Sequence, residues 1–156
     1  MTVHAVESWT AEPLTAYVHE AGARLLLLMT PAGQVLAQFG FTRAVDVMSA
    51  AALGAGIMAA TAELARQLGR PPFAALNHQG RRHGIFLSGL TTRRGPLVAL
   101  VVYDLDVSSL GLVQLFFEQL ATDLRAASPQ TGVSKQVLAA DFERELNDSL
   151  SALFGR

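Results

Sequence analysis

The stretch that decides the fold is FAALNHQGRRHGIFLSGLTTRRGPLVALVVY, residues 73–103. It contains three expected strands joined only by short turns, at residues 73–79, 82–90 and 97–103. Parallel strands need a crossover connection of a dozen or more residues, so these segments predict an antiparallel meander. The last segment, LVALVVY, is apolar throughout, which is typical of a strand covered on both faces and therefore central in its sheet.

The residues before this meander predict a helix, a hairpin and a second, longer helix. The first helix spans about residues 11–21, with Thr10 as a candidate N-cap. RLLLLMT at residues 24–30 is a second continuously apolar strand, and a Pro-Ala-Gly turn leads from it into a strand at residues 34–39. Helical spacing then continues from about residue 43 to residue 68.

A last domain helix follows the meander, and Ser108-Ser109 is expected to supply its N-cap. Its expected apolar stripe consists of Leu112, Leu115, Phe116, Leu120 and Leu124. The elements together predict one α+β domain, residues 1–126, with the order αββαβββα and a five-stranded antiparallel sheet flanked by helices. Residues 127–156 are expected to form a linker and a C-terminal amphipathic helix.

The C-terminal helix has an apolar stripe opposite acidic residues, and the stripe consists of Leu138, Phe142, Leu146, Leu150 and Leu153. It either packs on its own domain or docks on a partner. We favour docking, because the linker with Pro129 and Gly132 is long enough to release the helix.

Composition excludes several classes of function. The chain has 156 residues, 12 basic against 13 acidic side chains and no cysteine. Balanced charge argues against a nucleic-acid partner, and the lack of cysteine excludes disulfides and thiolate metal sites. The first twenty residues do not resemble a signal peptide, and the longest apolar stretch, residues 50–62, is too short to span a bilayer. We therefore expect a cytoplasmic protein without membrane insertion.

The search for catalytic or cofactor motifs returns weak candidates only. Gly54-Ala55-Gly56 opens a loose dinucleotide fingerprint, but the residues before it continue a helix and do not form a strand. A type II′ turn at Gly80-Arg81 would place His78 opposite His83, yet no third metal ligand is near. We predict no catalytic residue, no metal and no cofactor.

The long second helix has two faces of different character. One face carries larger apolar residues and is expected to lie on the sheet: Leu53, Ile57, Ala60, Leu64 and Leu68. The opposite face carries mostly small residues: Met48, Ala51, Ala55, Ala59, Ala62 and Arg66. Helix propensity alone would explain the alanines. We favour the other interpretation, a surface covered by a second subunit or a partner.

Two segments resemble a known family. His78-Gln79-Gly80, with Arg82 and Gly84 in the return strand, and SLGLVQL at residues 109–115 are similar to the roadblock/dynein light chain family. Within it the chain is most similar to the bacterial MglB type, over about residues 11–126 and in the amphipathic tail. The resemblance implies a roadblock/longin-like fold.

The resemblance also implies a homodimer in which edge strands pair, so that two five-stranded sheets become one ten-stranded sheet. The expected edge residues are Phe73, Ala75, Asn77 and Gln79. In the MglB type, the second-helix surface binds the small Ras-like GTPase MglA and promotes GTP hydrolysis by reorganising the GTPase's own switch residues. The implied function is thus regulation of an MglA-like GTPase by a protein that is not itself an enzyme. The alternatives are a structural adaptor without effect on hydrolysis and a small-ligand sensor.

Overall fold

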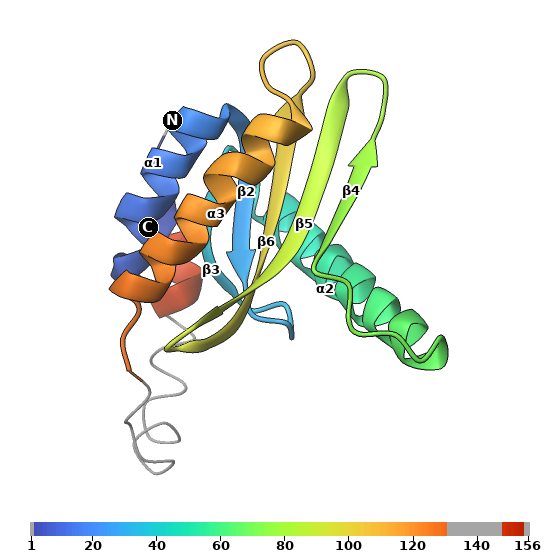
Figure 1. Ribbon diagram of the computed structural model, residues 1–156. Helices are drawn as coiled ribbons and strands as arrows, with labels where there is room; N and C mark the ends of the chain where they lie inside the picture. Colours follow the sequence, from blue (N-terminus) through green and yellow to red (C-terminus); the bar gives the residue numbers. More distant parts are fainter. Residues whose placement is uncertain (1, 131–147, 155–156) are drawn as a thin grey trace.

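The computed structural model describes residues 2–130 and 148–154 (Figure 1). A short strand β1 (His4–Ala5) and a 3-10 turn η1 (Ser8–Thr10) precede the first helix. The remaining elements are α1 (Ala11–Ala21), β2 (Ala23–Met29), β3 (Val35–Phe39), α2 (Ala44–Gln67), β4 (Ala75–Gln79), β5 (His83–Thr92), β6 (Gly95–Asp104) and α3 (Leu110–Ala127). The predicted αββαβββα order is confirmed.

The sheet is open and antiparallel, with the strand order β1-β3-β2-β6-β5-β4. The two strands predicted to be central, β2 and β6, lie in its middle. Their side chains alternate between two cores: Leu26 and Leu28 belong to one, Leu27 and Met29 to the other. Burial on both faces explains why these two segments are apolar without a period of two.

The N-terminal strand β1 is an addition to the expected five strands. His4 and Ala5 pair with Gln38 and Ala37 of β3, and the Val6 N–H donates to the Leu36 carbonyl at 2.7 Å. Two residues are too few to give a recognisable alternating pattern. The sheet therefore ends in a very short strand beside β3 and in the longer β4 at its other edge.

The turn between β4 and β5 differs from the predicted one. Gln79 pairs with Gly84, and the Gly80 N–H donates to the His83 carbonyl at 2.8 Å, so the loop is Arg81-Arg82. Gly80 does not adopt the positive φ that a type II′ turn requires. The register accordingly shifts, and His78 lies opposite Ile85 instead of His83.

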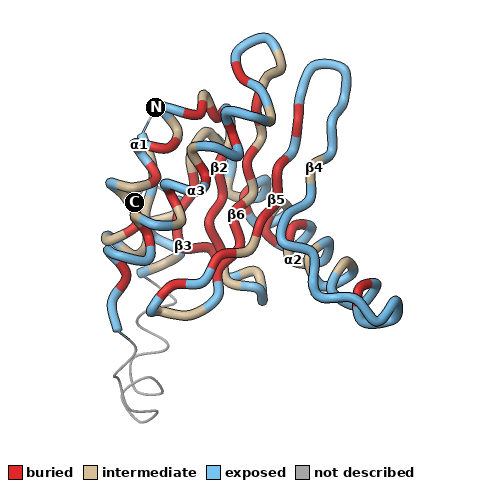
Figure 2. Tube along the Cα trace, viewed as in Figure 1, coloured by how far each residue is buried: buried red, intermediate tan, exposed pale blue. Residues whose placement is uncertain are grey.

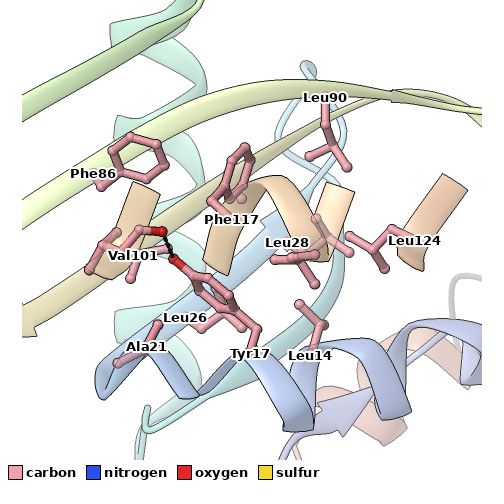
Figure 3. Packing of buried hydrophobic residues seen from close by; sticks show 14 of the residues in the cluster. Leu14, Tyr17, Ala21, Leu26, Leu28, Phe86, Leu90, Val101, Phe117 and Leu124 are labelled. Atoms are coloured by element: carbon pink, nitrogen blue, oxygen red, sulfur yellow. Dashed lines mark hydrogen bonds between the residues drawn. The ribbon is translucent and has the colours of Figure 1, made fainter. Parts of the chain in front are cut away.

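The larger core lies between one face of the sheet and the pair α1 and α3. Figure 3 shows Phe117 of α3 between Tyr17 and Phe86, with ring centroids 6.4 and 5.2 Å apart in edge-on contacts. The Tyr17 hydroxyl donates to the Val113 carbonyl at 3.0 Å. Aromatic packing of this kind fixes both helices against the sheet.

The buried stripe of α3 differs from the predicted one, although Leu120 and Leu124 belong to both. The helix buries Val113, Phe117, Leu120 and Leu124, whereas Leu112 and Leu115 are exposed. The N-cap prediction is confirmed, since the Ser109 hydroxyl accepts from the Leu112 N–H. Thr10 does not cap α1 with its side chain; its hydroxyl donates instead to the Glu7 carbonyl at 2.7 Å.

Replacing Phe117 by alanine should destabilise the domain by about 3–5 kcal/mol, because the cavity left between α3, α1 and β5 cannot collapse. Leu115→Ala on the exposed side of the same helix is the matched control, with an expected change within about 0.5 kcal/mol. Urea unfolding of both variants measures the difference. Equal losses would show that the stripe of α3 is assigned wrongly.

Candidate partner-binding surface

The second helix covers the opposite face of the sheet, and its inner side is made of small residues. Val47, Ala51 and Gly54 are buried there with Leu27, Met29, Leu87 and Val98 of the sheet. A Cβ added at Gly54 would lie 2.6 Å from the Met29 Cε. The helix thus approaches β2 so closely that a larger side chain at position 54 would force Met29 to move.

This arrangement overturns the predicted orientation of α2. Leu53, Ile57, Leu64 and Leu68 were expected on the sheet, but Leu53 is 68% exposed and Leu64 50%. Ala51, expected on the outer face, is only 2% exposed and is therefore not available to a partner. A helix that is apolar on nearly every side has no clear amphipathic signal, so the sequence pattern could not identify the buried face.

The exposed side of α2 has two flanks. We call the residues Leu53, Ile57, Leu64 and Leu68 the large-apolar flank. It faces the β4 side of the sheet, where Leu64, Met58, Phe73 and Leu76 line a groove of about 220 Å³ with Thr61 and Ala75. Figure 2 shows that β4 is exposed along most of its length and that much of α2 is exposed as well. An apolar surface of this extent is typical of a binding site for another macromolecule.

The strand β4 adds an unpaired backbone edge to this apolar surface. It pairs with β5 on one side, and within residues 2–130 and 148–154 no strand pairs with it on the other. All of its residues are exposed except Asn77, which is half-buried. Of the four predicted edge residues, Ala75, Asn77 and Gln79 lie in β4, and Phe73 precedes the strand as a wall of the groove.

The second flank, which we call the small-residue flank, retains most of the predicted partner surface: Met48, Ala55, Ala59, Ala62 and Arg66. Ala55 lies beside the β2–β3 turn, since a Cβ added at Gly33 would be 3.6 Å from the Ala55 Cβ. Arg66 forms an ion pair with Glu63, at 2.9 Å from Nε to Oε2. The hydrogen bond from Arg66 holds the pKa of the Glu63 carboxyl below its usual range. At neutral pH this end of the flank therefore carries an ion pair between the Glu63 carboxylate and the Arg66 guanidinium.

By length and composition, α2 could also cross a membrane, because its most apolar window has a mean hydropathy of 1.5. Asp46, Glu63 and Arg66 lie within the helix, and each is costly to place in hydrocarbon. Its inner side also packs on the sheet. We interpret the apolar flank as a protein-binding surface for these reasons.

The other candidates form structural contacts or do not come together. His83 bonds Asp104 at 2.7 Å and Arg24 bonds the same carboxylate at 3.1 Å, so the acidic residue has two partners of its own. Within residues 2–130 and 148–154, three potential metal ligands do not gather anywhere. The arginine doublets lie at opposite ends of β5, and Arg94 forms a half-buried ion pair with Glu7 at 2.7 Å.

The C-terminal tail is described only from residue 148, and Leu138, Phe142 and Leu146 lie outside the described residues. Residues 148–153 are helical. Leu153 packs in cis against the small core under α2 that contains Val47, while Leu150 is exposed. Leu153 thus follows the alternative in which the tail packs on its own domain.

Comparison with known proteins shows which family this geometry resembles. No protein-family model and no curated protein matches the chain significantly. Solved structures do match: the gliding protein MglB from Thermus thermophilus is 29% identical with a TM-score of 0.67, covering 79% of this chain and 90% of its own. An MglB with a tetrameric arrangement matches at 29% identity and a TM-score of 0.66, with the same coverage.

The chain resembles the MglB-like kind of roadblock protein. A Roadblock/LC7 domain from Streptomyces avermitilis, 14% identical with a TM-score of 0.62, has the same fold over 72% of this chain and 91% of its own. The roadblock assignment agrees with the open antiparallel sheet, with α1 and α3 on one face and α2 on the other.

The corrected faces of α2 predict opposite results for two alanine substitutions. Ala51→Arg would bury an unpaired charge against β2, which costs several kcal/mol, so the variant should unfold at a much lower temperature or fail to fold. Ala59→Arg places the same side chain on the exposed side and should leave the melting temperature within a few degrees of that of the parent protein. Thermal unfolding followed by circular dichroism decides. A stable Ala51→Arg variant would contradict the buried position of Ala51 and support the orientation of α2 that the sequence predicted.

Proposed function

We propose that this protein is a homodimeric regulator of a small Ras-like GTPase of the MglA type. The observation that carries the proposal is the coincidence, on one side of the monomer, of an unpaired strand edge and a long helix with an exposed apolar flank. Similarity to MglB supports the class of protein.

The second copy, in this proposal, pairs with β4 and covers the large-apolar flank. An unpaired edge invites association with other chains unless charge or proline protects it, and β4 has the sequence ALNHQ, with neither. Pairing two β4 edges would join the sheets of the two copies. The large-apolar flank lies on the same side as β4, because Leu64 and Leu76 line one groove, so a single contact buries both features.

The GTPase binds the small-residue flank. Met48, Ala55, Ala59 and Ala62 offer a surface that another backbone can approach closely, and it lies away from β4, beside the β2–β3 turn. These residues have no nucleophile and no free general base. The regulator therefore acts by reorganising the GTPase's own switch residues and supplies no catalytic group.

Dimerisation is tested by sedimentation equilibrium of the full chain at micromolar concentration, which should give twice the chain mass of 16.6 kDa. Leu64→Glu should raise the dissociation constant of the dimer about a hundredfold or more, because the carboxylate would be buried without a partner. Leu115→Glu, which changes an exposed leucine of α3, is the matched control and should dimerise normally. A parent protein that stays monomeric at high concentration contradicts the dimer.

Partner binding is tested with a GTP-loaded GTPase of the MglA type and the Ala59→Arg variant. The long charged side chain should weaken binding at least about tenfold, since it holds the two surfaces apart, while dimer mass stays unchanged. Gln114→Arg on α3 serves as the control. Binding accompanied by faster GTP hydrolysis supports a regulator; binding without a change in hydrolysis identifies an adaptor. No binding to either parent or control overturns the GTPase assignment.

A further inference from the structure

The edge strand β4 directs the backbone groups of alternate residues to its open side. Gly80 and His83 form a hydrogen-bonded pair, from Gly80 N–H to the His83 carbonyl at 2.8 Å. Bonded and non-bonded pairs alternate along an antiparallel ladder. The N–H and C=O groups of Gln79, Asn77 and Ala75 therefore point away from β5, toward a strand that would be added there.

Asn77 lies in the middle of these three residues. Two identical strands that pair antiparallel across a twofold axis place one residue opposite itself. The pairing that uses all three outward residues of both copies has Asn77 opposite Asn77 of the second copy, and Ala75 opposite Gln79. A shift of the strands by two residues would lose one of these positions at each end.

The side chain of Asn77 is held by a tyrosine from two strands away. Tyr103 of β6 is fully buried, and its hydroxyl donates to the Asn77 Oδ1 at 3.0 Å. The ring crosses β5 above Gly84, where an added Cβ would lie only 2.2 Å from the Tyr103 Cζ. Gly84 is thus the residue that lets Tyr103 reach the edge strand.

The hydrogen bond from Tyr103 uses the oxygen of the Asn77 amide and not its Nδ2 group. Among the described residues nothing accepts from the Asn77 Nδ2. An amide oxygen has two lone pairs, so Oδ1 can accept from Tyr103 and from one further donor. Two facing Asn77 side chains satisfy each other: each Nδ2 donates to the Oδ1 of the other copy, and each Oδ1 also accepts from its own Tyr103.

We propose that Asn77, oriented by Tyr103 across Gly84, sets the register in which β4 pairs with a second copy of this chain. The inference rests on the proposed homodimer and deepens it. Cross-strand polar pairs stabilise a sheet, and a polar pair in an interface disfavours every register that leaves a member without its partner.

The test compares dimer dissociation constants of the full chain by sedimentation. Asn77→Asp keeps the oxygen that Tyr103 bonds, replaces the donor and sets two carboxylates opposite each other, so the dissociation constant should rise about tenfold or more. Tyr103→Phe releases the amide in both copies and should weaken the dimer several-fold to about tenfold. Asn77 is only half-buried, so Asn77→Asp should fold, and the test does not depend on the folding of Tyr103→Phe.

Tyr17→Phe is the matched control. It also removes a hydroxyl that donates at 3.0 Å in the same core, but its acceptor is the Val113 carbonyl of α3 and not a side chain of β4. Its dimer should dissociate as the parent dimer does. A parent dimer that Tyr103→Phe and Asn77→Asp leave unchanged overturns the register role alone, as does equal weakening by Tyr17→Phe and Tyr103→Phe. A monomeric parent overturns the proposed dimer as well.

Discussion

The close contact between α2 and β2 determines which surface this molecule offers to partners. Gly54 lies against the Met29 methyl group, and Ala51 is buried beside it, so the helix sits low on the sheet. Small residues on the inner side leave the larger apolar residues for the outer side. Leu53 and Leu64 are exposed in the monomer for this reason. The monomer forgoes the free energy of burying these side chains, and a second molecule that covers them would recover it.

The two faces of the sheet are covered unequally, and this asymmetry gives the apolar surface its position. On one face α1 and α3 form a two-helix layer with an aromatic core around Phe117. On the other face the described residues place α2, with the tail residue Leu153 packed near Val47, and the C-terminal part of α2 projects past β4 (Figure 1). Leu76 and Ile85 remain about two-fifths exposed beneath it. A second copy placed at β4 would supply the missing cover for the sheet and for the helix together.

The sequence predicted the elements better than the faces. The continuous apolar runs of β2 and β6 identified central strands, because burial on both sides removes any alternation. The two faces of α2 could not be told apart from its pattern, since alanine, glycine and leucine occur all around it. Gly80 suggested a type II′ turn, yet the turn lies at Arg81-Arg82 without a positive φ, which separated His78 from His83. The contact between Tyr103 and Asn77 had no signal in the sequence, because its residues are 26 positions apart and joined only by the sheet register.

In the proposed function, dimerisation and partner binding use two flanks of one helix, and this arrangement would couple them. If the large-apolar flank is covered by a second copy, the small-residue flanks of the two copies are held at a fixed spacing by the paired β4 strands. A partner that contacts the small-residue flanks of both copies then binds the dimer more tightly than the monomer, and by linkage it stabilises the dimer by the same free energy. A partner that contacts the small-residue flank of one copy alone gives no such coupling. The concentration dependence of dimerisation with and without the GTPase thus distinguishes one GTPase per dimer from one per protomer.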